Sequence, residues 1–202
     1  AEILAEVDLG LTIDDVQLVP WARGYATVQE APNAMLFSTA LTDQRKNMFK
    51  WVGPIYSLNL ALIAKKSANI EISSVQELEG YRIATVREDV SEQLLVEQGY
   101  SLDKLDRTVD FPTTLKKLMA GRTDILSYDE VSVLLAVKEN GGNPDDYEAI
   151  YTLEVTDLYY AFNPGVSDAV IAQFQQVLDK LRESGKVDEI VKDAQTEMDS
   201  IS

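Results

Sequence analysis

Residues 37–67 read FSTALTDQRKNMFKWVGPIYSLNLALIAKKS, and this stretch decides the fold because a polar turn leads through aromatic residues into a long apolar run. Thr42 is a good N-cap residue, so the pattern predicts a helix over 42–49 that carries Arg45 in its first turn. Backbone N–H groups, the positive end of the helix dipole and a guanidinium then converge on one anion, such as a carboxylate. The alternative stays open, since an arginine in such a turn is more often simply solvated.

On both sides of this stretch, strand patterns alternate with helix patterns, which predicts an α/β fold with a mostly parallel sheet. The chain begins directly with a helix, and no flexible linker divides it, so any two lobes must be joined by crossing strands. Strands are expected at 16–20, 34–37, 56–65, 82–86, 107–111, 124–127, 147–153 and 158–162. Further helices are expected at 21–30, 91–98, 113–120 and 130–139, followed by a helix capped by Ser167 and another over 186–198.

The composition excludes several classes of function. The chain has 202 residues, and 34 acidic side chains against 18 basic ones give a net charge of −16, which argues against nucleic acid as a partner. Because the chain has no cysteine and no histidine, disulfides, thiol nucleophiles and the usual zinc, copper and haem ligands are excluded. We therefore expect no metal and no cofactor.

No local motif for catalysis is present either. Neither a nucleophile beside a base nor a paired carboxylate can be found along the chain, so we expect no catalytic residue and no enzyme. An acid–base mechanism on carboxylates that meet only in space stays open as an alternative. No apolar run reaches the roughly 20 residues of a membrane-spanning helix. There is no leader with basic, apolar and small-residue regions, so an exported form would have lost its signal peptide.

Three further residues are candidates for ligand contact. Asp129 follows the strand expected at 124–127, at the carboxyl end where α/β sheets bind ligands. Its more common role is to cap the helix that follows, and both roles can coexist. Trp21 lies where a strand ends and a helix starts, and aromatic walls are frequent in small-molecule clefts. Asp89 opens the helix expected at 91–98, where it either contacts ligand or only stabilises the helix dipole.

The order of these motifs resembles the bacterial extracellular solute-binding proteins of the polar amino-acid type, the receptors of ABC importers. The resemblance lies in the Thr-x-x-Arg of 42–45, the aromatic segment, the Gly-Pro-Ile-Tyr of 53–56 and the apolar strand ending in Lys-Lys-Ser. It continues through the Leu-Met-Ala-Gly-Arg-Thr-Asp of 118–124 to the final pair of helices around Gly185.

The resemblance implies a two-lobed type II periplasmic-binding-protein fold. Lobe one would comprise residues 1–66 and 156–202, and lobe two residues 67–155, with hinge strands near 64–68 and 152–157. The strand with which the family usually begins is absent before the first helix. We therefore expect either a fragment, or a second copy or a rearranged segment that fills the gap, and a monomer unless a second copy supplies the strand.

The resemblance also implies roles for residues. Arg45 matches the arginine that grips the ligand α-carboxylate, Ser38 and Thr39 lie beside the positions that support it, and Asp129 matches the acid that takes the α-ammonium. The family's usual Gly-Thr before the second-lobe helix is replaced by Glu88 and Asp89, which points away from a standard amino acid.

The expected function is extracytoplasmic, periplasmic or extracellular binding of a small zwitterionic or carboxylate solute by lobe closure. The partners implied are this solute and a membrane-embedded ABC permease that receives it. Two alternatives stay open: a dehydratase or hydrolase on the same fold, and the ligand-sensing domain of a membrane receptor.

Overall fold

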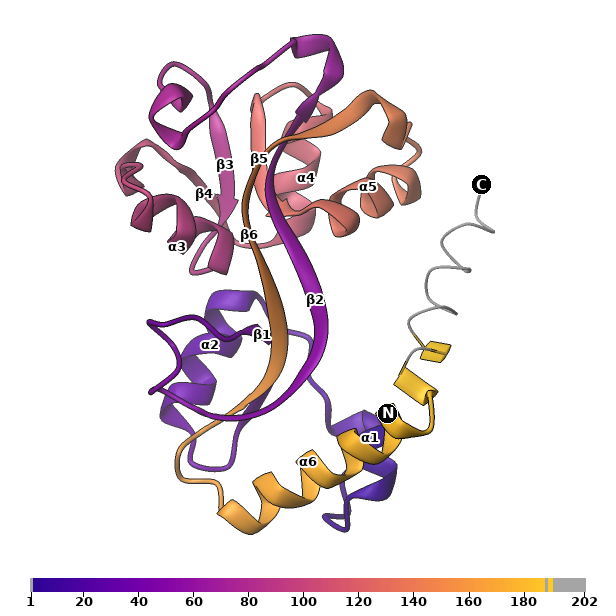
Figure 1. Ribbon diagram of the computed structural model, residues 1–202. Coiled ribbons are helices and arrows are strands. Elements are labelled where there is room, and N and C mark those ends of the chain that lie inside the picture. Colours follow the sequence, from indigo (N-terminus) through magenta and orange to yellow (C-terminus); the bar gives the residue numbers. More distant parts are fainter. Residues whose placement is uncertain (1, 188, 191–202) are drawn as a thin grey trace. The chain divides into compact units, whose positions relative to one another are not determined.

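The computed structural model describes residues 2–187, 189 and 190, and its elements alternate between helices and strands (Figure 1). The helices are α1 (Glu2–Glu6), α2 (Trp21–Glu30), α3 (Val90–Glu97), α4 (Phe111–Met119), α5 (Glu130–Glu139) and α6 (Asp168–Glu183). The strands are β1 (Met35–Ala40), β2 (Lys50–Lys65), β3 (Ile83–Val86), β4 (Asp106–Thr108), β5 (Ile125–Asp129) and β6 (Tyr147–Phe162). The predicted α/β class is confirmed.

These strands form one sheet in the order β1-β6-β2-β5-β3-β4. β3 runs parallel to both β4 and β5, whereas β1 is antiparallel to β6 and β2 is antiparallel to β5. The prediction of a mostly parallel sheet is therefore wrong. Helices connect the parallel strands β3, β4 and β5, but the long strand β2 runs against β5, and β1 runs against β6.

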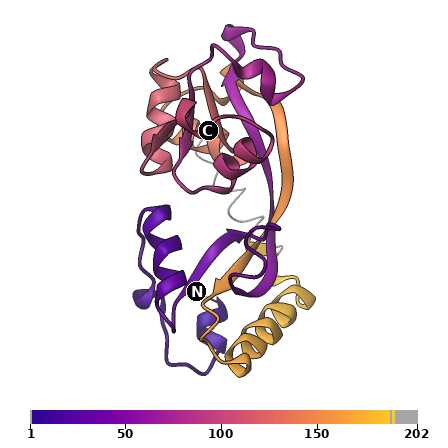
Figure 2. The same ribbon diagram turned by 90° about the vertical axis from the view of Figure 1, so that its left-hand side faces the viewer.

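The chain divides into two compact units. Unit 1 lies within Ala1–Val19, Ala26–Ile55 and Leu158–Ser202, and unit 2 comprises Pro20–Tyr25 and Tyr56–Asp157. β2 and β6 are neighbours in the sheet, and both pass from one unit into the other (Figures 1 and 2). The expectation that crossing strands join two parts is therefore confirmed. Which residues bound the lobes and act as hinges stays a prediction.

The core of unit 1 forms where α6 packs against the sheet and α1. Ser167 caps α6 by accepting a hydrogen bond from the Val170 amide, and an apolar stripe then follows the helical period. This stripe packs with Ile3 and Val7 of the first helix and its continuation. The buried members of the stripe are Phe174, Val177, Leu178 and Leu181.

The core of unit 2 forms around β5. In Figure 1, α4 and α5 lie on one side of β3 and β5 and α3 lies on the other. Leucines of α4 and valines of α5 pack onto Leu126 of β5 and onto Ala61 and Ile63 of β2. Asp110 and Asp129 cap α4 and α5 with side-chain acceptors, so both helices begin at the sheet's edge with satisfied amides.

Two segments do not form the secondary structure that their sequence predicts. Residues 16–20 form no strand: no other described segment pairs with them, and Leu18 is 92% exposed. Residues 42–49 form turns rather than a helix. The Lys46 amide reaches back four residues to the Thr42 carbonyl, but the Arg45 and Met48 amides reach back three, which is the pattern of turns.

Two further predictions concern the second half of the chain. The strands expected at 147–153 and 158–162 are one strand, β6, which continues through the residues between them beside its neighbour β2. The helix expected at 186–198 lies largely outside the described residues.

Candidate functional site

In unit 1 the candidate residues lie in β1 and in the turn that follows it. The ladder between β1 and β6 is irregular between Leu36 and Thr39, and Ser38 there has a left-handed φ of 57°. Ser38 is exposed, whereas Thr39 is fully buried. The Arg45 amide donates to the Thr42 carbonyl at 3.0 Å and to the Thr42 hydroxyl at 3.3 Å. Thr42 therefore caps the turn as predicted, although no helix follows.

Arg45 is one of the largest buried side chains described, with 1% of its surface exposed. This argues against the alternative of a solvated surface arginine, which would lie in water with Lys46 and Asp43, an exposed pair at 2.7 Å. Burying a guanidinium costs free energy unless acceptors meet its N–H donors. A buried arginine is therefore expected where it binds polar or anionic groups.

In unit 2 the candidate Asp129 ends β5 and caps α5. Its Oδ2 accepts from the Ser132 amide at 2.9 Å and from the Ser132 hydroxyl at 2.7 Å, and its Oδ1 accepts from the Asn59 amide at 3.1 Å. Asn59 also donates to Glu130 at 2.7 Å. The helix-capping role is therefore present, and both carboxylate oxygens of Asp129 are held in a fixed orientation.

The second candidate of unit 2, Asp89, caps α3. Its Oδ1 accepts from the Ser91 amide at 2.9 Å and from the Ser91 hydroxyl at 2.7 Å. The Ser91 hydroxyl also donates to the Ser127 carbonyl of β5, at 2.9 Å. The two helix N-termini of α3 and α5 are thus each closed by an aspartate, which satisfies amides that could otherwise face an anion.

The turn before Asp89 rests on a buried ion pair. Glu92 is 3% exposed, and Arg107 of β4 binds both of its oxygens, at 2.8 and 2.7 Å. Burial would raise the pKa of Glu92, but hydrogen bonds from Arg107, the Glu88 amide and Thr85 hold that pKa below its usual range. The same pairing raises the pKa of Arg107. Both groups therefore stay charged at neutral pH.

Tyr128 lies in the same neighbourhood, between Ser127 and Asp129 in sequence. Its ring stacks on Phe111 with centroids 4.3 Å apart and planes within 11°. Burial raises the pKa of the Tyr128 hydroxyl, and the negative charges of Asp89 and Asp129 raise it further. The hydroxyl therefore stays protonated at neutral pH.

Trp21 opens α2 and groups with unit 2. Its indole Nε1 donates to the Glu88 carbonyl at 2.7 Å, and its ring stacks on Tyr25 with centroids 5.9 Å apart. The side chain expected to form an aromatic wall thus contacts the same turn that carries Asp89.

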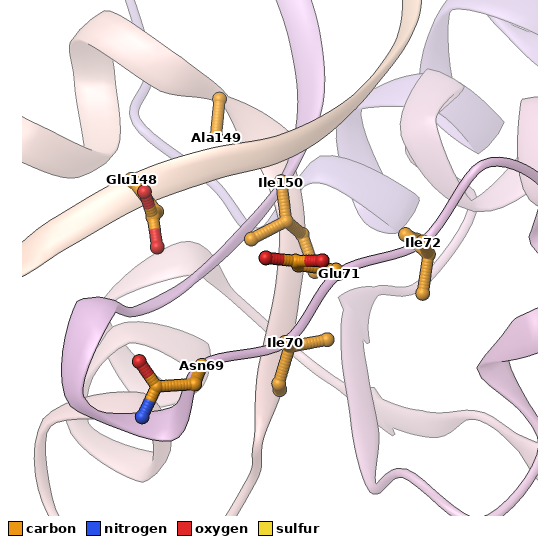
Figure 3. Close-up of a pocket in the computed structure, with 7 residues that line it drawn as sticks. All are labelled: Asn69, Ile70, Glu71, Ile72, Glu148, Ala149 and Ile150. Atoms are coloured by element: carbon orange, nitrogen blue, oxygen red, sulfur yellow. The ribbon is translucent and has the colours of Figure 1, made fainter.

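A separate groove of about 340 Å³ lies elsewhere in unit 2, between the segment after β2 and the start of β6 (Figure 3). It contains none of the predicted site residues. Its walls carry the carboxylates Glu71 and Glu148 among short apolar side chains; the lining residues are Asn69, Ile70, Glu71, Ile72, Glu148, Ala149 and Ile150.

Two searches of the described residues bear on other kinds of site. In that part of the chain, no helix is long and apolar enough to cross a membrane. The same residues contain no group of three or more acidic side chains arranged to hold a metal ion.

Solved structures of other proteins share this arrangement of elements. The amino-acid ABC transporter substrate-binding protein AbpA from Streptococcus pneumoniae, bound to L-arginine, has a TM-score of 0.81 at 20% identity, over 98% of this chain and 81% of its own. A mutant of ArgBP from T. maritima has a TM-score of 0.81 at 16% identity, over 95% and 80%. A histidine kinase sensor domain with similarity to periplasmic binding proteins has a TM-score of 0.76 at 21% identity, over 88% and 76%.

The fold is that of a type II periplasmic binding protein. No protein-family model matches the sequence. The comparison with curated proteins also gives no match. At identities of 16–21%, the structural likeness shows the fold alone. Any assignment of a ligand therefore has to be argued from this chain's own residues.

Within this type II fold, the predicted residues fall into two groups. Ser38 and Thr39 lie in β1 and Arg45 lies in the turn that follows, all within unit 1, whereas Asp89 and Asp129 lie in unit 2. Their contacts with a ligand stay predictions.

Sequence analysis missed Glu92, Arg107 and Tyr128. One signal was present for Glu92: it follows Asp89 by three residues, the spacing at which a glutamate reaches back over a helix N-terminus. Arg107 gave no such signal, because its approach to Glu92 depends on the pairing of β3 with β4.

Proposed function

We propose that this protein binds a small amino-acid-like or carboxylate solute outside the cytoplasm, by closure of two lobes, and delivers it to an ABC permease. The observation that carries this proposal is the likeness of the fold, over almost the whole chain, to substrate-binding proteins of amino-acid transporters. No catalytic residue is assigned. The lobes would be 1–66 with 156–202 and 67–155, moving about hinges near 64–68 and 152–157.

Each candidate residue has a chemical role in this proposal. Arg45 offers a planar fork of donors that suits a carboxylate, with Ser38 and Thr39 as supporting hydroxyl and backbone donors. The buried state of Arg45 supports this role, because a ligand carboxylate would compensate its charge. In unit 2, Asp129 would accept the ligand ammonium, and Trp21 and Asp89 would line the site.

The experiment uses L-arginine as the first probe, because the AbpA structure contains it. A thermal-shift screen of amino acids and small carboxylates follows, since a ligand that binds only the folded state raises the melting temperature. For any ligand found, Arg45→Ala should weaken binding at least about 100-fold in calorimetry, which corresponds to roughly 2.7 kcal/mol. Lys46→Ala is the matched control, because it removes a neighbouring exposed cation.

Two outcomes separate binding from folding. Arg45→Lys keeps the charge but loses the fork, so it should bind with intermediate affinity while circular dichroism shows an intact fold. An affinity that is unchanged in Arg45→Ala would contradict the carboxylate role.

A second candidate function is favoured by the likeness to a histidine kinase sensor domain. There, ligand closure would drive a partner domain rather than transport. Reading the gene beyond Ser202 tests this: a membrane-spanning segment followed by a kinase or cyclase domain supports the sensor, and a stop codon supports the transport receptor.

A further inference from the structure

Glu88 has a backbone conformation that side chains rarely adopt. Its φ is 62°, in the left-handed region, which is sterically unfavourable for a residue other than glycine. Such a conformation persists only where neighbouring contacts hold it. The turn concerned joins the carboxyl end of β3 to the N-terminus of α3 and carries Asp89.

Trp21 Nε1 holds the Glu88 carbonyl, and the buried Glu92 carboxylate holds the other side of the turn. Its Oε1 accepts from the Glu88 amide at 3.0 Å and from Arg107 Nη2 at 2.7 Å. Its Oε2 accepts from Arg107 Nε at 2.8 Å and from the Thr85 hydroxyl at 2.9 Å. Arg107 Nη2 also reaches the Glu88 carboxylate at 3.2 Å. The amide and the carboxylate of Glu88 are therefore both tied to one ion pair.

We propose that Glu92, clamped by Arg107, is a positioning residue that holds Glu88 in the left-handed conformation and thereby sets the Asp89 turn for ligand contact. The last part of this inference rests on the proposed function. The turn's position supports it: the carboxyl ends of the parallel strands β3 and β5 lead to Asp89 and Asp129, which cap α3 and α5. Glu92 itself contacts no ligand in this proposal.

Glu92→Gln is the variant that tests this role. A glutamine has one acceptor oxygen in place of two, and its amide group would face the donors of Arg107. Even with its oxygen at the Oε1 position, it would turn its amide N–H groups toward Arg107 Nε, so it loses the negative charge and the second bond that clamp Arg107 beside the Glu88 amide. Glu88→Gly is the rescue, because glycine adopts the left-handed conformation without the steric cost and no longer needs to be held.

The experiment compares wild type, Glu92→Gln, Glu88→Gly and the double variant in two measurements. Amide hydrogen exchange by NMR should be faster at Asp89 and Ser91 in Glu92→Gln and return toward the wild-type rate in the double variant. L-arginine affinity by calorimetry should fall about tenfold in Glu92→Gln and recover to within about twofold in the double variant.

Asp124→Asn is the matched control. Asp124 binds Arg82 with both oxygens, at 3.0 and 2.6 Å, at the opposite end of β3. Removing its charge also breaks an arginine–carboxylate pair of unit 2, but it should leave both the exchange of the Asp89 turn and the affinity unchanged.

Two outcomes overturn the proposal. Unchanged exchange at the turn in Glu92→Gln shows that Glu92 does not hold it. If affinity falls in Glu92→Gln and the double variant does not recover it, Glu92 only stabilises the fold. If wild-type protein does not bind L-arginine, the proposed function fails for that probe, whereas the exchange series still decides whether Glu92 sets the turn.

Discussion

The two ends of β3 carry the same kind of ion pair with different consequences. At the amino end Arg82 grips Asp124, and at the carboxyl end Arg107 grips Glu92, each through Nε and Nη2. The side chains of the first pair are 58% and 30% exposed, and those of the second are 27% and 3% exposed. Geometry therefore does not distinguish the pairs. Burial does, because only a charge withdrawn from water depends strongly on its partner.

The sharpest test of this comparison removes the cation from the buried pair. Arg107→Met leaves the Glu92 carboxylate buried with only the Thr85 hydroxyl and the Glu88 amide, so we expect a loss of about 3 kcal/mol in the free energy of unfolding. Urea denaturation followed by circular dichroism measures it.

Lys117→Met is the control for this variant. Lys117 pairs with Asp106, the neighbour of Arg107 in β4. The two side chains of this pair are about one-third and one-half exposed. Its loss should be below about 1 kcal/mol. Equal losses in the two variants would show that burial does not separate these pairs.

The second test uses pH. The pKa of Glu92 lies below its usual value of 4.5 in the folded protein, so its ionised form stabilises the fold. That contribution is fully present above about pH 4.5 and is lost as the pH falls through the lowered native pKa. Glu92→Gln should lower the free energy of unfolding by about 2 kcal/mol at pH 7. The gap to wild type should shrink as the pH falls below 4.5, as urea midpoints from pH 3 to 7 would show. A gap that stays constant to pH 3 would contradict the assignment.

The smallest effect is expected at the exposed end of β3. Asp124→Asn should lower the urea midpoint less than either change at the buried pair, because water already solvates Arg82. Adding 1 M sodium chloride should reduce this loss further and leave the loss of Arg107→Met nearly unchanged, since salt screens exposed charges far more than buried ones. Equal salt sensitivity of the two variants would argue against the difference in burial.

The sequence predicted those features of the fold that local patterns determine. The Ser167 cap of α6 and the aspartates that start α3 and α5 follow from the positions of these residues in the sequence. The segment 16–20 shows the limit of such patterns: it has strand-forming residues, but a strand also needs a partner, and the described residues provide none. The direction of the strands was misjudged for a related reason, because β2 and β6 pair across long sequence distances.

For the candidate site, the sequence predicted the local roles of single residues but not the side chains that contact them in the folded structure. Asp129 and Thr42 have the capping roles that their positions suggest. The support of the Asp89 turn was not predictable, because it depends on β4 bringing Arg107 beside Glu92, and a charged residue in a short strand is ordinarily exposed. The left-handed Glu88 was equally hidden, since glycine is the residue that marks such a conformation in a sequence.

The passage of β2 and β6 through both units affects how the chain folds during synthesis. Unit 1 needs contacts such as those of Lys50 with Val166 and of Val28 with Asn163, whose partners leave the ribosome only after all of unit 2. Unit 2 is nearly contiguous and can collapse first, whereas the first part of unit 1 waits with its apolar side chains uncovered. Contacts this distant in sequence form slowly, so the early segment depends on chaperones or on delayed folding until the last helix arrives.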